Sequence, residues 1–225
     1  MALILHIETA TTNCSVALSV NGELVALNEI NDGYAHAENL SILVEKCIKY
    51  AGKSLKELNA ISVSLGPGSY TGLRIGVSTA KGLAYALSIP IIGIGTLEAF
   101  AHAGDVSSFN GVKIPMLDAR RMEVYQAVYK DNKLLEEVSA NIITVDSFTA
   151  YANEQVLLYG PGADKLDALF GEVENIEVRK GVFPSAKDMI IPAMEKYQKE
   201  EFEDVAYFEP FYLKDFVAGK PKKLL

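Results

Sequence analysis

Apolar and polar positions divide the first hundred residues into alternating strands and helices. Asn21-Gly22 predicts a hairpin turn between two of the strands, and Gly52 predicts the end of the first helix. Runs of β-branched and alternating apolar residues predict strands over 3–7, 14–20, 24–30, 60–65 and 90–94. Helical spacing of apolar or small residues predicts helices over 37–51, 70–87 and 97–103. The pattern therefore indicates an α/β protein with a mixed sheet.

The predicted helix over 70–87 carries a stripe of small residues on one face. Every fourth position is small, and the series is Gly72, Gly76, Ala80, Ala84 and Ser88. A stripe without bulk lets another backbone come close. That backbone belongs either to the chain's own sheet and first helix, which is the default for a globular protein, or to a second protein. The sequence alone leaves both open.

A glycine turn precedes this helix and is a candidate nucleotide or anion site. Gly66 and Gly68 can adopt a positive φ, and Ser69 or Thr71 can cap the helix. Backbone N–H groups at a helix start favour anions, and Arg74 follows one helical turn later. The glycine spacing matches neither a P-loop nor the dinucleotide-binding pattern. Tight packing between strand and helix is the simpler interpretation of the turn.

A second copy of the pattern begins after a polar stretch at 104–111, which we take as a domain boundary. Glu8 and Asp118 each end the first strand of a copy, 118 − 8 = 110 positions apart, and the next hairpin turns share that offset. A second Gly-Pro-Gly, at 160–162, follows with an offset of 160 − 66 = 94. We therefore expect a duplicated unit, residues 1–104 and a reduced second half 111–225, whose C-terminal segment packs back on the first.

Charge and cysteine content narrow the function classes. The 225-residue chain has a net charge of −8 and a pI near 5.0, which disfavours a protein that grips nucleic acid by itself. Its only basic cluster is the tail segment 220–223. Cys14 and Cys47 fit no metal or redox motif, so we expect reduced, buried thiols and a cytoplasmic protein. We predict neither a signal peptide nor a transmembrane helix.

Few residues suggest chemistry of their own. Glu8 and Asp118 are candidate cleft acids, because paired carboxylates at strand ends can hold Mg²⁺, although an acid in a strand-end turn is as common. His6, His36 and His102 are not spaced for a helical two-histidine metal site, so we predict no metal.

Five segments together resemble one known family, the TsaB (YeaZ) proteins. The match runs in order along nearly the whole chain and is most specific in the Gly-Pro-Gly-Ser-Tyr-Thr-Gly-Leu-Arg-Ile-Gly stretch. The segments are Ile4–Leu18, His36–Leu40, Gly66–Gly76, Asp118–Tyr125 and Pro210–Lys214.

The resemblance implies an actin/Hsp70/sugar-kinase-like fold built from two ribonuclease-H-like halves. It implies a role in making N6-threonylcarbamoyladenosine at tRNA position 37, as a non-catalytic scaffold or activator subunit. The partners it implies are a TsaD-like catalytic paralogue, on which the chain docks, and a TsaE-like ATPase. A homodimer is expected in isolation, tRNA is bound only through the complex, and no membrane is involved. No cofactor is tightly bound, and ATP or ADP is expected only at the partner interface.

The docking surface implied by the resemblance lies on the helices of the first half, 36–51 and 70–87. Combined with the small-residue stripe, this gives ten candidate partner-binding residues: His36, Leu40, Leu43, Val44, Cys47, Gly72, Gly76, Val77, Ala80 and Ala84. A bulky residue at Gly76 or Ala80 is expected to abolish docking while the monomer stays folded. The alternatives are an ATP-binding kinase or ATPase of the same fold and, less favoured, a metallopeptidase of the M22 glycoprotease class.

Overall fold

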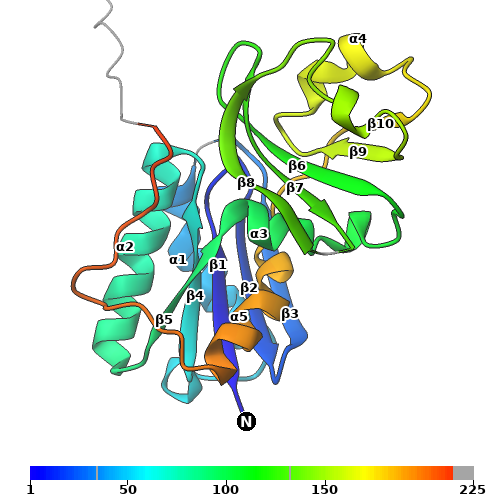
Figure 1. Cartoon of the computed structure of the whole chain (residues 1–225). Helices are drawn as coiled ribbons and strands as arrows, with labels where there is room; N and C mark the ends of the chain where they lie inside the picture. Colours follow the sequence, from blue (N-terminus) through cyan, green and yellow to red (C-terminus); the bar gives the residue numbers. More distant parts are fainter. Residues whose placement is uncertain (34, 132, 215–225) are drawn as a thin grey trace, which may run out of the picture.

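The computed structural model describes residues 1–33, 35–131 and 133–214, and the basic tail segment 220–223 lies outside them. Two five-stranded mixed sheets form the two halves of the molecule, with helices packed against the first (Figure 1). The strand order is β3-β2-β1-β4-β5 in the first sheet. It is β8-β7-β6-β9-β10 in the second, so the same topology occurs twice. The predicted duplicated α/β fold is thus confirmed.

The first sheet follows the predicted strands closely. Its middle strand β1 is buried along its whole length, because it pairs with β2 on one side and β4 on the other and is covered on both faces. The hairpin β1–β2–β3 is antiparallel, and β1, β4 and β5 run parallel. The strands are β1 (Leu3–Glu8), β2 (Cys14–Val20), β3 (Glu23–Ile30), β4 (Ala60–Gly66) and β5 (Ile91–Gly95).

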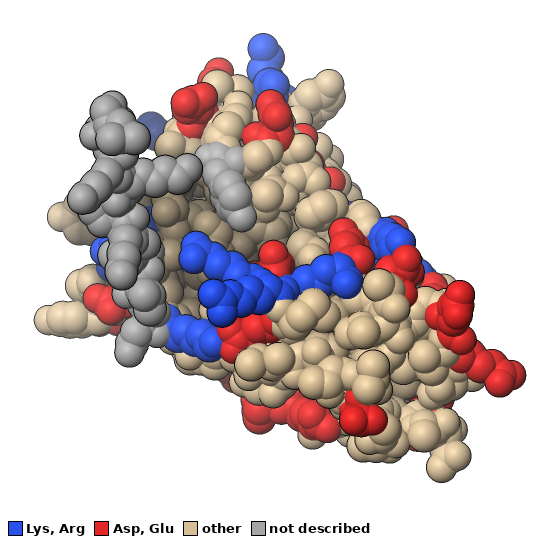
Figure 2. Space-filling model, turned by 90° about the horizontal axis from the view of Figure 1, so that it is seen from above, with Lys and Arg blue, Asp and Glu red and all other residues tan. Residues whose placement is uncertain are grey.

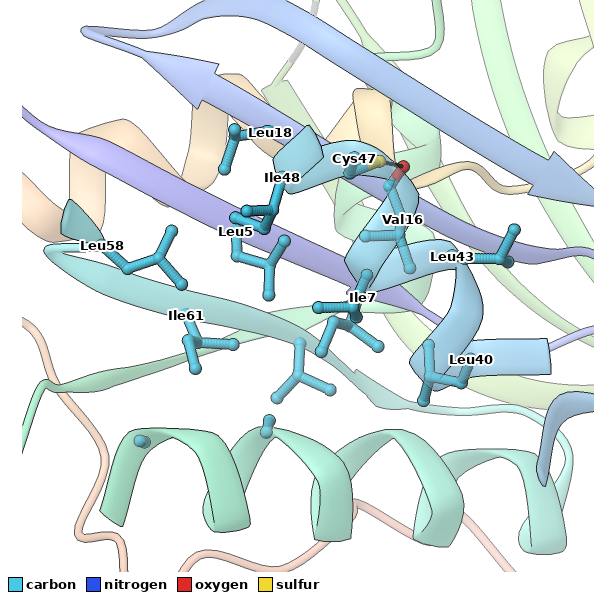
Figure 3. Packing of buried hydrophobic residues seen from close by; sticks show 14 of the residues in the cluster. Leu5, Ile7, Val16, Leu18, Leu40, Leu43, Cys47, Ile48, Leu58 and Ile61 are labelled. Atoms are coloured by element: carbon cyan, nitrogen blue, oxygen red, sulfur yellow. Dashed lines mark hydrogen bonds between the residues drawn. The ribbon is translucent and has the colours of Figure 1, made fainter. Parts of the chain in front are cut away.

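Two long helices, α1 (His36–Tyr50) and α2 (Tyr70–Leu87), cover one face of this sheet (Figure 1). Both bury an apolar stripe in the largest core cluster of the chain, which Figure 3 shows from close by. Leu40 and Leu43 of α1 meet Ile7 of β1 there. The chain between α1 and β4 includes the short 3₁₀ turn η1 (Leu55–Glu57). The amphipathic pattern therefore orients both helices onto the sheet.

The second half keeps the strands but reduces the helices. Only η3 (Thr149–Tyr151) follows β8, in line with the expected loss of material there. The helix expected after the second Gly-Pro-Gly is reduced to η4 (Asp164–Leu166) and the four-residue α4 (Asp167–Phe170). This shortening explains the smaller offset of the second glycine turn. The strands are β6 (Val112–Asp118), β7 (Glu123–Lys130), β8 (Lys133–Ile142), β9 (Val156–Tyr159) and β10 (Ile176–Arg179).

The short helix α3 (Thr96–Ala101) joins the two halves, and the turn η2 (Gly104–Val106) follows it. Leu97 packs with Leu117 and Ala127 of the second sheet. On another side of α3, the rings of Phe100 and Tyr159 lie 4.9 Å apart, and the Tyr159 hydroxyl donates to the Phe100 carbonyl at 3.1 Å. The halves therefore meet through a packed apolar contact.

The chain returns to the first half after β10. The turn η5 (Ala186–Met189) contacts β1 and β2, and α5 (Ile190–Gln198) packs against β5, on the opposite face from α1 and α2. Beyond α5, the segment 203–214 runs past α2 toward the second half, and Lys81 of α2 donates to its Ala206 and Phe208 carbonyls (Figure 1). We refer to this segment as the strap.

Candidate functional site

A cleft of about 960 Å³ lies between the two halves. One wall is the glycine turn with the first turn of α2, and the other is the β6–β7 turn. The strap contributes its last four described residues, 211–214, to the same cleft. His36, the first residue of α1, also lines it, so both long helices begin at the cleft.

The glycine turn is packed closely under residues 9–11. Ser69 donates its N–H to the Ala10 carbonyl at 2.7 Å, and its Oγ caps α2 by accepting from Gly72 N at 3.2 Å. A Cβ atom on Gly68 would stand 2.6 Å from the Ala10 carbonyl oxygen. Glycine is therefore needed here for close approach between backbones.

Only some of the candidate anion-binding residues reach the cleft. Gly68, Ser69 and Thr71 line it. Gly66 is buried beneath the Phe211 carbonyl of the strap, so it presents nothing to a ligand. Arg74 lines a separate hollow and donates to the Tyr70 hydroxyl at 2.8 Å. Three of the five candidate residues therefore line the cleft, and Gly66 and Arg74 do not.

Glu8 and Asp118 do not form the predicted carboxylate pair. Glu8 is fully buried, and its Oε1 accepts from Ala10 N at 2.6 Å, which turns the carboxyl under the backbone instead of into the cleft. Burial raises its pKa to about 7. Asp118 lies on the cleft wall and pairs with Lys165, which also donates to the Glu123 carbonyl at 2.7 Å. Each acid thus has its own structural role.

The three histidines are spread over the first half. His6 is fully buried, with its ring nitrogens 2.6 Å from Ser62 Oγ and 2.8 Å from Ser19 Oγ, and burial lowers its pKa to about 3. His36 is also buried, and its Nε2 lies 2.7 Å from the Thr11 carbonyl. His102 follows α3. In the described parts of the chain, no three His, Cys, Asp or Glu side chains gather as a group that could hold a metal.

The ten predicted partner-binding residues are all buried within this chain, and that prediction is corrected here. The small-residue stripe of α2 lies against the end of β1, because Cβ atoms on Gly72 and Gly76 would overlap Thr9. The others belong to the core beneath the two helices or, for His36, to the backbone contact with Thr11. The ten residues are His36, Leu40, Leu43, Val44, Cys47, Gly72, Gly76, Val77, Ala80 and Ala84.

The opposite sides of the same two helices are exposed and adjoin each other. A shallow hollow of about 500 Å³ lies between the start of α1, at Ala37, and the outer side of α2. On α2 it is lined by residues 70–79, with Thr71, Arg74 and Ser78 exposed. We call this exposed side of α1 and α2, with the hollow between them, the helix-pair face.

Sequence reasoning missed several residues at the cleft. Arg120 and Arg121 form the tip of the β6–β7 turn, and both have a positive φ, 74° and 51°. Lys165 and Lys214 bind the acids on either side of this turn, Asp118 and Glu123. These partners lie 47 and 91 positions apart in the chain, so no local pattern could have paired them.

The fold and the two-walled cleft define a duplicated α/β protein whose two halves share one sheet topology. A family model described as TsaD, tRNA N6-adenosine threonylcarbamoyltransferase, matches residues 33–222. An Escherichia coli protein named tRNA threonylcarbamoyladenosine biosynthesis protein TsaB is 33% identical over 96% of both chains. The Bacillus subtilis protein of the same name is 36% identical over 64% of this chain and 63% of its own.

Solved structures agree on the fold. A Pseudomonas aeruginosa protein described as similar to the peptidase YeaZ superposes with a TM-score of 0.81 at 24% identity, covering 95% of this chain and all of that one. YeaZ from the same organism gives 0.77 at 24% identity over the same shares. The chain belongs to the TsaB (YeaZ) family.

No helix in the described part of the chain has the length and apolar character needed to cross a membrane.

Proposed function

We propose that this chain is a non-catalytic subunit of a cytoplasmic complex that makes N6-threonylcarbamoyladenosine in tRNA. In this proposal it docks on a TsaD-like catalytic paralogue and activates it, with a TsaE-like ATPase joining the assembly. Support comes from the relatives named for this biosynthesis and from the match to the TsaD family model. Binding of ATP or ADP is confined to the partner interface, and tRNA is held by the assembled complex.

The observation that carries the docking proposal is the helix-pair face. Two adjacent helices present a continuous exposed side with small or short residues, such as Ala37 and Ser78, around a hollow. Short side chains let a partner's helices approach closely, as in a helix bundle. Ile42 of α1 and Tyr85 of α2 are exposed apolar side chains, 47% and 82% accessible, that such an interface would bury. A second copy of the chain is the alternative occupant when the paralogue is absent.

Reconstitution tests the function. The purified chain is mixed with the TsaD-like and TsaE-like proteins of the same organism, unmodified tRNA, ATP and pre-formed threonylcarbamoyl-adenylate, the activated donor that releases AMP on transfer. The modified nucleoside is measured by mass spectrometry. We expect the product to form with all three proteins and to fall to background when this chain is omitted. Product formation at the same rate without it would contradict the proposal.

A kinase or ATPase of the same fold remains the second candidate, because the cleft contains the start of α2 with Gly68, Ser69 and Thr71. Calorimetry of the isolated chain with ATP and Mg²⁺ distinguishes an ATP-binding enzyme from a docking subunit. Binding with a micromolar dissociation constant, about −8 kcal/mol, would favour the enzyme. The docking proposal expects no such binding to the isolated chain.

A further inference from the structure

Two arginines at the cleft stand out in an acidic chain. Figure 2 shows Lys and Arg side chains gathered in a band across one face of the molecule. Arg120 lines the cleft, and Arg121 is the next residue of the β6–β7 turn; both side chains are exposed. The chain as a whole carries a net charge of −8, so the local surplus of positive charge is unlike the rest of the molecule.

The two acids that flank the turn are already paired with other cations. Asp118, before the turn, pairs with Lys165, and Glu123, after it, pairs with Lys214 of the strap. Among the residues that the structure describes, neither Arg120 nor Arg121 takes part in an ion pair or donates a side-chain hydrogen bond. Their two charges are therefore available to a partner.

Hydrogen bonds that do not involve the side chains of Arg120 and Arg121 stabilise the β6–β7 turn. Asp118 Oδ1 accepts from Arg120 N at 3.0 Å, and the Arg120 carbonyl accepts from Glu123 N at 3.1 Å. Both arginines have a positive φ, which glycine and asparagine adopt more readily. Arginine is thus not required by the backbone here, and the rigid turn presents both guanidinium groups to solvent.

The position of the β6–β7 turn indicates which kind of partner could contact its two arginines. The cleft that Arg120 lines is also lined by the first residues of α1 and α2, His36 and Tyr70, where the helix-pair face begins. The hollow of the helix-pair face and the cleft share Tyr70, Thr71 and Ile75, so a protein docked on that face would lie next to this rim. Phosphate contacts need only positioned cations, whereas a protein interface needs an apolar core, and the turn offers only Met122, 36% exposed.

We propose that Arg120 and Arg121 contact the phosphate backbone of the tRNA when this chain is bound to its catalytic partner. The inference rests on the proposed function and adds a direct RNA contact to it. Two arginines in an acidic chain are too few for tight binding alone, so the contact strengthens and orients tRNA already held by the partner.

The test compares tRNA binding by three complexes with the TsaD-like partner, using filter retention from 50 to 300 mM salt. The first contains the unchanged chain, the second R120Q/R121Q and the third the control K133Q/K199Q, which removes two exposed lysines, from β8 and from the end of α5. Near 150 mM salt we expect about tenfold weaker binding for the arginine variant, and a log–log salt slope shallower by about 1.5. The control should match the unchanged complex.

Two results would overturn the inference. One is an arginine variant that assembles normally and keeps both the affinity and the salt slope of the unchanged complex. The other is an arginine variant that no longer assembles, which would show that the turn binds the partner protein instead of RNA. Failure of the unchanged chain to assemble would instead contradict the proposed function, so the two failures are distinguishable.

Discussion

Gly76 of α2 lies directly against Thr9 at the end of β1, so closely that a Cβ atom at position 76 would overlap Thr9 Oγ1. The small-residue stripe therefore serves the chain's own fold. It brings α2 down onto the backbone that leaves β1, and it holds the wall of the cleft in place.

This contact predicts that Gly76→Val destabilises the monomer. The added side chain has no space beside Thr9, so we expect the free energy of unfolding to fall by about 3 kcal/mol, measured by urea denaturation. Gly82→Ala on the same helix is the matched control, because a Cβ there meets nothing within 4 Å. It should raise stability by about 0.5–1 kcal/mol. A Gly76→Val protein as stable as the unchanged chain would contradict the packing described here.

The stripe also shows what sequence periodicity can and cannot predict. Four-residue spacing correctly placed Gly72, Gly76, Ala80 and Ala84 on one helix face. It could not say whether a sheet of the same chain or a second protein lies against that face. The exposed side of α2, with Thr71 and Ser78, carries no comparable signal because short polar residues are ordinary on a solvated helix.

The buried His6 predicts a loss of stability in acid. Its folded pKa is about 3 against a reference of 6.5, so between these values the unfolded chain binds a proton that the folded chain does not. The free energy of unfolding contributed by this residue should fall by about 1.4 kcal/mol for each pH unit below 6.5. Urea denaturation of the unchanged chain and of His6→Asn at several pH values measures this contribution as the difference between their free energies of unfolding. A stability difference between the two proteins that stays constant from pH 6.5 to 4.5 would contradict the prediction.

The buried Glu8 predicts the opposite pH dependence of the free energy of unfolding, a loss of stability as the pH rises. Burial raises its folded pKa to about 7 from 4.5, so its contribution to stability is complete below pH 4.5 and is lost as the pH rises through 7. Asp188, which lies close enough to Glu8 to raise its own pKa further, is shifted the same way. Glu8→Gln keeps the acceptor for Ala10 N without the charge. We expect it to be more stable than the unchanged chain above pH 7 by up to about 3 kcal/mol.

The measurement for Glu8 is again urea denaturation, between pH 5 and 8. The gain from Glu8→Gln should grow with pH across this range. A gain that is the same at both ends, or a loss that deepens with pH, would show that the carboxyl is not held neutral in the folded chain.

The strap predicts that Phe208 anchors the C-terminal segment. Its side chain is 6% exposed and packs over Gly93, while Lys81 Nζ donates to the carbonyls of Ala206 and Phe208, both at 3.0 Å. Phe208→Ala should lower stability by about 3 kcal/mol and speed proteolysis of residues 203–214. Phe211→Ala, whose side chain is 45% exposed, is the control and should cost under about 1 kcal/mol. Equal cleavage rates for the two variants would contradict the anchor.

More of the fold than of the cleft could be predicted from the sequence. Alternation and turn residues located the first-half strands because β1–β3 are joined by short, strongly marked turns. The smaller offset of the second glycine turn predicted the loss of material around η3. The short α4 was not predicted, because the residues after the second Gly-Pro-Gly keep apolar positions without forming a long helix. Long-range pairs such as Lys165 with Asp118 depend on how the halves meet, which no local pattern records.

The central claim is that the helix-pair face binds the catalytic paralogue, and an affinity measurement tests it most directly. Ser78→Arg places a long charged side chain in the hollow between α1 and α2, and Ser108→Arg makes the same change at an exposed serine between the halves. Isothermal titration with the TsaD-like protein should show at least about 100-fold weaker binding for Ser78→Arg, a loss of about 2.7 kcal/mol, with Ser108→Arg unchanged. Equal affinity for Ser78→Arg and the unchanged chain would place the docking surface elsewhere.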